Sequence, residues 1–182
     1  MYQRPDWESY FMTLAAVAAT RSTCLRRQVG AVIVRDGQII STGYNGSPKG
    51  TPHCFETGCL RAQLNIPSGE RQEMCRGSHA EMNAISQAAS VGVSTAGAVL
   101  YCTHSPCAFC SKAIINAGIV RVVYLYSYPD ELAERLRREA GLISERFPAE
   151  KRAAILACLD TARENVTIDD TQSHGKEGCS CC

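Results

Sequence analysis

Two short segments carry the residue types of a metal site with one open position. His79-Ala80-Glu81 supplies an imidazole and a carboxylate, and Pro106-Cys107-Ala108-Phe109-Cys110 supplies two thiols. One nitrogen and two sulfurs make three protein ligands for a tetrahedral zinc. Catalytic zinc sites combine three protein ligands with a water, whereas structural sites use four protein ligands. The sequence therefore predicts a catalytic zinc bound by His79, Cys107 and Cys110.

A carboxylate beside these ligands would complete a hydrolytic centre. Zinc lowers the pKa of a bound water toward neutrality, so hydroxide is available at physiological pH. A hydrolysis also needs a group that moves protons from the water to the leaving group, and Glu81 lies two residues after His79. Pro106 suits the entry to a helix, and the spacing of Cys107 and Cys110 places both sulfurs on one face of its first turn. We therefore expect Glu81 to be the catalytic acid and base.

Each of these residues also has a purely structural interpretation. Ser78 and Glu81 fit the S-x-x-E pattern of a capping box. Buried cysteines often act as small hydrophobic residues, and a single histidine is more often structural than metal-bound. All of these structural interpretations would have to be true at once to explain both segments, whereas a single metal site explains both. The metal interpretation is therefore preferred.

Composition limits the class of protein. A chain of 182 residues is long enough for one domain with an ordinary core. With 19 basic and 18 acidic residues the net charge is +1, which gives no sign of a nucleic-acid partner. No apolar run approaches the roughly 18–20 residues of a membrane span, and the first residues lack the layout of a signal peptide. We therefore expect a cytoplasmic protein. Because its eleven cysteines are also an odd number, we expect metal-bound rather than paired cysteines.

The hydrophobic pattern predicts the elements that position the candidate ligands. Helices are expected over residues 7–20, 79–89, 107–117, 130–139 and 148–165, and strands over 29–34, 38–44, 98–103 and 121–126. Asp36-Gly37 is typical of a hairpin turn between the first two strands. This order predicts an α/β fold with a mixed sheet and helices on its faces. Residues 1–165 are expected to form a single domain, and the cysteine-containing segment 166–182 a mobile tail.

Further segments carry a family resemblance. The two metal-site segments, His79-Ala80-Glu81 and Pro106-Cys107-Ala108-Phe109-Cys110, form the H-x-E…P-C-x-x-C pattern of zinc-dependent deaminases. Around them, the chain resembles the deoxycytidylate deaminases of the cytidine and deoxycytidylate deaminase superfamily, particularly bacterial and phage forms, over about residues 7–126. The segments that carry this resemblance are Arg21-Ser22-Thr23-Cys24, Gly43-Tyr44-Asn45-Gly46 and Tyr101-Cys102-Thr103-His104-Ser105-Pro106-Cys107. It implies a three-layer αβα fold of the cytidine-deaminase type, with both metal-bearing helices on one side of the sheet.

The resemblance also implies a reaction and a substrate site. The reaction is the zinc-dependent hydrolysis of dCMP to dUMP with release of ammonia, which supplies dUMP for thymidylate synthesis. Asn45 would bind a sugar hydroxyl, although Asn45-Gly46 is also an ordinary turn pair. The 5′-phosphate needs cationic donors, for which arginine is well suited. The remaining substrate-binding candidates are Arg26, Arg27 and Lys49 for the phosphate, Ala80 and Ser105 for the pyrimidine, and Tyr126 or Tyr128 to close over the ligand.

Regulation and assembly are implied in the same way. Many family members are activated by dCTP and inhibited by dTTP, with the segment Gly43, Tyr44, Asn45 and Gly46 in the regulatory site. They are typically homo-oligomers, hexamers or smaller. Two other functions stay open: deamination of a base in tRNA or of another nucleoside or nucleotide, and a noncatalytic zinc-binding module in which Glu81 is dispensable.

A second zinc is expected near a long insertion. Residues 45–78 lack any sustained period, and such a segment cannot bury enough apolar surface to offset its ordering entropy without a cross-link. Phage and bacterial members of the resembled family carry an additional zinc at a corresponding insertion. The candidate ligands for this structural site are Cys24, Cys54, Cys59 and Cys75, with His53 as a substitute; four unrelated reduced thiols are the alternative.

Overall fold

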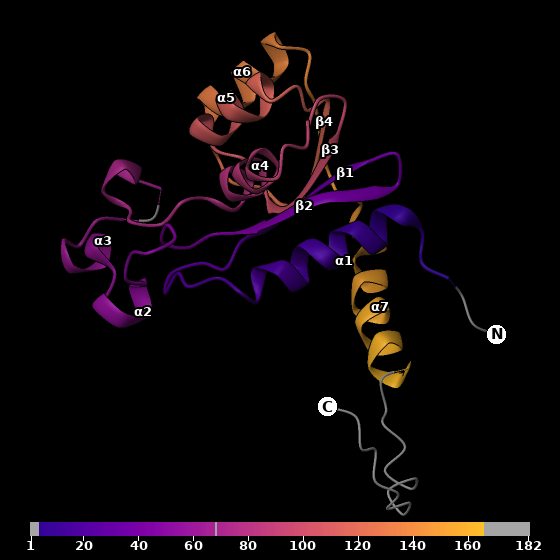
Figure 1. The fold of residues 1–182 in the computed structure, drawn as a ribbon, viewed down its shortest axis with the longest axis horizontal. Coiled ribbons are helices and arrows are strands. Elements are labelled where there is room, and N and C mark those ends of the chain that lie inside the picture. Colours follow the sequence, from indigo (N-terminus) through magenta and orange to yellow (C-terminus); the bar gives the residue numbers. More distant parts are fainter. Residues whose placement is uncertain (1–3, 68, 166–182) are drawn as a thin grey trace, which may run out of the picture.

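The centre of the fold is a five-stranded mixed sheet with the strand order β2-β1-β3-β4-β5. The computed structural model describes residues 4–67 and 69–165 (Figure 1). Strand β1 pairs antiparallel with both β2 and β3, while β3, β4 and β5 run parallel to one another. The strands are β1 (Gly30–Arg35), β2 (Gln38–Tyr44), β3 (Val99–His104), β4 (Arg121–Tyr126) and β5 (Ile143–Arg146).

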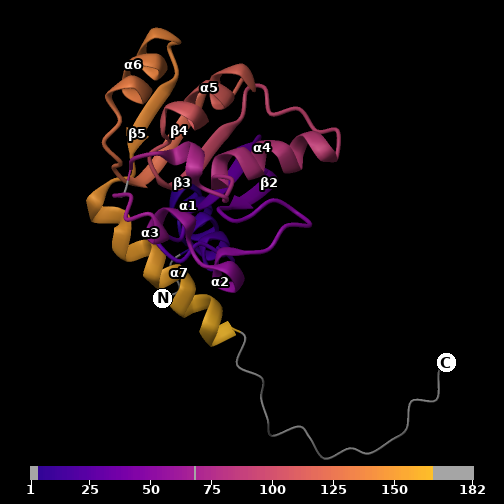
Figure 2. The same ribbon diagram turned by 90° about the vertical axis from the view of Figure 1, so that its left-hand side faces the viewer.

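Helices cover both faces of the sheet. One face packs against α1 and α7, and the other against α4, α5 and α6, as the two ribbon views show (Figures 1 and 2). Two short helices and a 3₁₀ turn lie in the insertion between β2 and α4, and a second 3₁₀ turn precedes α7. The helices are α1 (Trp7–Ala19), α2 (Cys54–Thr57), α3 (Leu60–Gln63), α4 (Ala80–Ser90), α5 (Ala108–Asn116), α6 (Glu131–Glu139) and α7 (Arg152–Asn165), and the 3₁₀ turns are Gln72–Met74 and Ala149–Lys151.

Alternation along the strands produces two separate cores. In β1, Ala31 and Ile33 pack with α4 and α5, whereas Val32 and Val34 pack with α1. Successive side chains of a strand point to opposite faces, so a strand buried on both faces is apolar throughout. The core against α4 and α5 contains Cys107 and Cys110. The two helices that carry the candidate ligands therefore share one face of the sheet, as expected.

The predicted three-layer α/β architecture with a mixed sheet is confirmed, with two differences. No strand is predicted between the expected helices 130–139 and 148–165, since Ile-Ser-Glu-Arg shows no apolar alternation. The structure has a four-residue edge strand there, β5, which pairs with β4. The insertion contains two short helices, α2 and α3, where no regular structure was predicted. The expected tail at residues 166–182 lies outside the described residues. Within the described ranges, no helix combines the length and apolar character of a membrane span.

Candidate metal and substrate site

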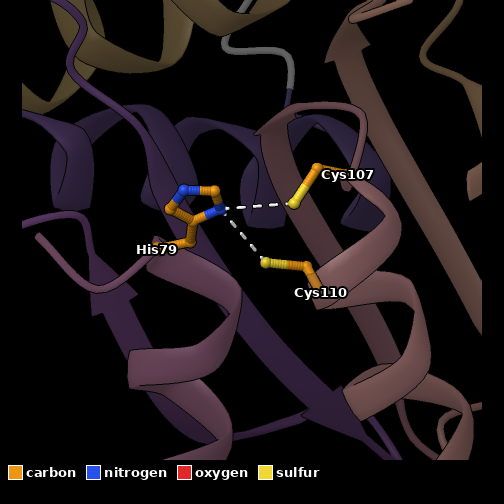
Figure 3. A group of neighbouring side chains, drawn as sticks. All are labelled: His79, Cys107 and Cys110. Carbon is orange, nitrogen blue, oxygen red and sulfur yellow. Dashed lines mark hydrogen bonds between the residues drawn. The ribbon is translucent and has the colours of Figure 1, made fainter. Parts of the chain in front are cut away.

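The three predicted metal ligands converge from two helix starts. His79 is the N-cap residue of α4, Cys107 is the N-cap residue of α5, and Cys110 lies in the first turn of α5. Figure 3 shows the imidazole pointing from the start of α4 toward both sulfurs on α5. Because the two helices lie side by side on one face of the sheet, ligands 28 and 31 residues apart in the chain come together.

The donor set fits a tetrahedral zinc. His79 Nδ1 lies 3.4 Å from Cys107 Sγ and 3.4 Å from Cys110 Sγ. Bonds of about 2.0 Å to nitrogen and about 2.3 Å to sulfur, at the tetrahedral angle, separate the two ligand atoms by about 3.5 Å. All three ligand atoms lie within 4.8 Å of one another. The two nitrogen–sulfur distances are therefore those of a tetrahedral zinc site with three protein ligands and one open position.

The electrostatics of the three ligands are strongly coupled. Hydrogen bonding with Cys110, followed by the bond with His79, lowers the pKa of the Cys107 thiol to about 4. The same interaction with Cys107, together with burial, raises the pKa of Cys110. Hydrogen bonding with Cys107 raises the pKa of His79. The site thus already favours one thiolate, and a bound cation would favour the second because metal ligation requires thiolate.

Glu81 faces the metal site and does not cap its helix. Its side chain is 4% exposed, and burial is the main reason that its pKa is raised. It interacts with both His79 and Cys110. The N-cap position belongs to His79 and not to Ser78, so the capping-box interpretation of Ser78 and Glu81 does not describe α4. A buried carboxylate of raised pKa beside a metal site is suited to proton transfer near neutral pH.

A cavity of about 140 Å³ lies next to these residues. His79, Ala80, Glu81 and Cys107 contribute to its wall. The other lining residues come from the loop before β1, the end of β2, the insertion and the ends of β3 and β4. They are Cys24, Arg26, Arg27, Val29, Asn45, Gly46, Cys54, Cys59, Arg61, Gly69, Gln72, Cys75, Gly77, Ser78, His104, Ser105 and Tyr128.

Most predicted substrate residues line this cavity, but two lie elsewhere. Arg26, Arg27, Asn45, Ala80 and Ser105 are part of its wall. Lys49 is exposed in the turn after β2, and Tyr126 is 47% exposed at the end of β4; neither lines the cavity. Tyr128, the alternative to Tyr126, does line it. Tyr128, two residues past the end of β4, therefore lies in the cavity wall where Tyr126 does not.

Asn45 has a structural role as well as a place in the cavity. Its Oδ1 accepts hydrogen bonds from Ser22 Oγ at 2.7 Å and from the Val29 amide at 2.8 Å. Its Nδ2 donates to the Arg27 carbonyl at 2.8 Å. The side chain therefore joins the end of β2 to the loop before β1, and one amide hydrogen is left to donate to a ligand. Of the four segment residues, Gly46 also lines the cavity, while Gly43 and Tyr44 do not.

Ser105 is likewise engaged by the protein. Its Oγ accepts from the Tyr128 amide at 2.7 Å and donates to the Tyr128 carbonyl at 3.1 Å. The Tyr128 hydroxyl in turn accepts from Gln72 Nε2 at 3.0 Å, so the insertion is tied to the segment after β4. Ser105 thereby positions Tyr128, and the Tyr128 ring lies 5.8 Å from the Arg27 guanidinium.

The lining residues without a predicted role in the site include Arg61, Gln72 and His104. Arg61 and Gln72 belong to the aperiodic insertion, where no pattern distinguishes them from surface residues. His104 ends β3, and a polar residue at the carboxyl end of a parallel strand was an available signal. Burial, and then the nearby Arg27, lower the pKa of His104. Its imidazole is therefore neutral near pH 7 and can both donate and accept a hydrogen bond.

The four remaining candidate ligands gather in the same cavity but do not form a closed set. Cys24, Cys54, Cys59 and Cys75 all line it. Burial first, and then the other three cysteines, raise the pKa of Cys54. In the described part of the chain, His79, Cys107 and Cys110 form the one group of three or more potential ligands with donor atoms within 4.8 Å of one another. The four sulfurs thus share one environment at wider spacing, and the substitute His53 caps α2 away from the cavity.

Known proteins resemble this chain in sequence and fold. A family model described as the cytidine and deoxycytidylate deaminase zinc-binding region matches residues 5–126. The deoxycytidylate deaminase of Schizosaccharomyces pombe is 46% identical over 140 residues, which cover 76% of this chain and 43% of that protein. The deoxycytidylate deaminase of Mycobacterium phage D29 is 41% identical over 126 residues, covering 66% of this chain and 95% of the phage protein.

A solved structure of a related protein has a similar fold. The crystal structure of dCMP deaminase from cyanophage S-TIM5, in complex with dCMP and dUMP, superposes with a TM-score of 0.67 at 30% identity. The match covers 80% of this chain and all (100%) of the phage chain. The cytidine-deaminase-like fold is therefore confirmed. This chain spans less than half the length of the S. pombe relative, 43%.

Proposed function

Because this chain belongs to the cytidine and deoxycytidylate deaminase family, we propose that it catalyses the zinc-dependent hydrolytic deamination of dCMP to dUMP with release of ammonia. The observation that carries the proposal is the meeting of His79, Cys107 and Cys110 at zinc-binding distances beside the buried Glu81, in the wall of a cavity that also contains three arginines. The relatives named as deoxycytidylate deaminases support the same substrate.

The residues divide the reaction between them. Bound at His79, Cys107 and Cys110, zinc supplies Lewis acidity and lowers the pKa of a coordinated water. Water adds at C4 of the cytosine ring, and the C4–N bond to the exocyclic amine breaks. Glu81 accepts one proton from the water and transfers it to ring N3. It then takes the second proton from the hydroxyl at C4 and transfers it to the amine, which leaves as ammonia while C4=O forms. Burial raises the pKa of Glu81, so its carboxyl can both take and return a proton near neutral pH.

Three unpaired arginines favour a nucleotide over a nucleoside. Arg26, Arg27 and Arg61 line the cavity, and among the side chains described in residues 4–67 and 69–159 no carboxylate lies within 4.0 Å of any of them. Other cations of the chain do have acidic partners, namely Arg71, Arg121, Arg135 and Lys151. Cationic groups in a cavity without acidic partners are suited to an anionic ligand, and guanidinium groups bind phosphate in a bidentate manner. We assign the 5′-phosphate to this arginine group.

The rest of the cavity can orient the nucleoside. The free amide hydrogen of Asn45 is available to a sugar hydroxyl. The backbone of Ala80, at the start of α4, and the segment at Ser105 border the position expected for the pyrimidine. Tyr128 offers an aromatic face above the cavity, because its backbone is held by Ser105 and its hydroxyl by Gln72. These contacts would place C4 of the base near Glu81.

We also propose that Cys24, Cys54, Cys59 and Cys75 bind a second, structural zinc. Their common position in the cavity wall and the mutual effect on the pKa of Cys54 support this assignment. Four thiolates are the ligand set of closed structural zinc sites. Because the sulfurs are spaced more widely than a bound zinc allows, metal binding would draw the insertion toward the loop before β1.

Regulation, assembly and location are proposed on the family relationship. We infer that dCTP and dTTP modulate activity through the segment Gly43 to Gly46, that the protein forms a homo-oligomer of six or fewer subunits, and that it supplies dUMP in the cytoplasm. Tyr44 supports a ligand contact there, since it is 38% exposed and directly precedes the cavity residue Asn45. A change in dCMP turnover on adding dCTP or dTTP, and mass measurement in solution, test these points.

A substrate panel tests the main proposal. Ammonia release is measured with dCMP, CMP, dCTP, deoxycytidine and 5-methyl-dCMP, and with a tRNA anticodon stem-loop. We expect dCMP to be deaminated with the highest kcat/KM. Release from the stem-loop but not from dCMP would assign the chain to nucleic-acid deamination, and no release from any compound by zinc-loaded protein would identify a noncatalytic zinc module.

A further inference from the structure

Helix α5 starts without a side-chain cap of its own. Its N-cap residue is Cys107, whose sulfur points to His79 and makes no capping hydrogen bond. The first amide groups of any helix lack intrahelical partners and need other acceptors. The segment Pro106–Ser111 brackets both cysteine ligands, so whatever holds these backbone groups also sets the positions of the two sulfurs.

Asp130 supplies the missing cap from outside the helix. Its Oδ2 accepts a hydrogen bond from the Ala108 amide at 2.8 Å, one residue after Cys107. Its Oδ1 accepts from the Ala133 amide at 3.0 Å and so caps α6. One carboxylate therefore joins the starts of two helices, and the negative charge lies at the positive end of both helix dipoles.

Arg137 holds both ends of the same segment. It lies on α6, beside α5 (Figures 1 and 2), and is 5% exposed. Its Nη1 donates to the Pro106 carbonyl at 2.7 Å and to Ser111 Oγ at 2.9 Å. Pro106 directly precedes Cys107, and Ser111, which is fully buried, directly follows Cys110.

The burial of Arg137 is costly and calls for compensation. In the part of the chain that the structure describes, no carboxylate lies within 4.0 Å of its guanidinium. A buried cation without a counter-charge is strongly unfavourable unless hydrogen bonds or opposite charge stabilise it. The hydrogen-bond partners of Arg137 are the two residues that flank the cysteine ligands.

We propose that Asp130 and Arg137 are positioning residues for the zinc centre, which hold Pro106–Ser111 so that both thiolates keep the spacing that zinc requires. This inference goes beyond the proposed deamination but rests on the same zinc site. Both residues follow residue 126, where the match to the family model ends. Residues that orient metal ligands typically change metal affinity by about 10–100-fold when they are removed.

The test compares zinc retention in folded, zinc-loaded protein. Transfer of zinc from His79, Cys107 and Cys110 to a chromophoric chelator is followed for wild type, Arg137→Met, Arg137→Lys and the control Arg138→Met. Arg138 is an exposed neighbour on the same helix. We expect Arg137→Met to weaken zinc binding by about 10–100-fold, Arg137→Lys to recover part of this loss, and the control to stay within about twofold of wild type. Comparing wild type with Cys54→Ser, which should lack the second zinc, identifies which of the two zinc ions is released.

A second measurement separates positioning from stability. In cobalt-substituted protein, the thiolate-to-cobalt absorption bands report the geometry of the two sulfurs. Asp130→Asn removes one of the two carboxylate oxygens that accept hydrogen bonds. We expect Asp130→Asn and Arg137→Met to shift or weaken the cobalt bands, and Arg138→Met to leave them unchanged. If Arg137→Met does not fold, Asp130→Asn and Arg137→Lys provide the same comparison.

The outcomes separate this inference from the proposed function. Unchanged zinc affinity and unchanged cobalt bands in Arg137→Met and Asp130→Asn, even with a lower melting temperature, would overturn the positioning role. That result would leave dCMP turnover by wild type intact. A wild-type protein inactive on dCMP would instead refute the proposed substrate, while the zinc and cobalt measurements would still be interpretable.

Discussion

Gly43 of β2 and Ala80 of α4 are in direct backbone contact: a Cβ atom at Gly43 would lie 2.2 Å from the Ala80 carbonyl oxygen. The same atom would lie 2.5 Å from the Ala84 nitrogen. Ala80 stands between His79, a proposed metal ligand, and Glu81, the proposed proton carrier. The absence of a side chain at Gly43 therefore sets how closely the helix carrying the site approaches the sheet.

Gly43→Ala is expected to move α4 and weaken the metal site. The new methyl group meets backbone atoms, which cannot rotate away, so we expect a loss of about 1–3 kcal/mol in the free energy of unfolding together with weaker zinc binding. Gly30→Ala is the matched control, because a Cβ there would lie 2.0 Å from the Ala15 carbonyl oxygen of α1, on the opposite face. Denaturant unfolding and chelator competition check the pair. Equal zinc affinity in both variants would contradict the role of Gly43.

Glu81→Gln should abolish proton transfer while leaving zinc in place. The amide keeps the shape of the carboxylate but cannot exchange protons, so kcat for dCMP should fall by at least about 10²–10⁴-fold. Zinc content should remain at the wild-type value, because Glu81 is not a ligand. His79→Ala provides the contrast and should lose both zinc and activity. Wild-type turnover in Glu81→Gln would refute the mechanism.

Removing cavity arginines should affect the nucleotide and spare the nucleoside. Each of Arg27→Ala and Arg61→Ala removes a charge-assisted hydrogen bond of about 1.5–3 kcal/mol, so kcat/KM for dCMP should fall by about 10–150-fold. Turnover of deoxycytidine, which lacks the phosphate, should stay low and unchanged. Lys49→Ala serves as the control because Lys49 lies outside the cavity. The phosphate assignment fails if the arginine variants reduce dCMP and deoxycytidine turnover by the same factor.

Freshly purified protein should contain about two zinc ions per chain. Cys54→Ser should lose one of them, because serine does not replace a thiolate in a four-cysteine site, and proteolysis within residues 45–78 should become faster. Cys158→Ser, a change on α7 away from the cavity, should keep both ions. Metal analysis and limited proteolysis measure the two effects. A value of one zinc in wild type would exclude the second site and leave the catalytic site unaffected.

Local patterns made much of this structure predictable. The spacing of Cys107 and Cys110 on one helical turn and the position of His79 at a helix start depend on residues a few positions apart. Alternating and helical periodicity likewise identified the five longer helices and the first four strands, but not the short helices α2 and α3. Strand β5 was missed because its Ile-Ser-Glu-Arg sequence has no alternation, and pairing with β4 is what makes it a strand.

The amino-acid sequence by itself determined the mixed α/β fold, the His/Cys/Cys set of candidate zinc ligands and the choice of Glu81 as the proposed proton carrier, since each depends on residue type and short-range spacing. Only the tertiary structure decided which distant side chains share the cavity. It placed Arg61 there and left Lys49 outside, and it showed that Asn45 and Ser105 also hold the loops together. It also brought Asp130 and Arg137 to the zinc-ligand turn. Such contacts join residues tens of positions apart, and they arise from packing of whole helices against the sheet, which no local pattern records.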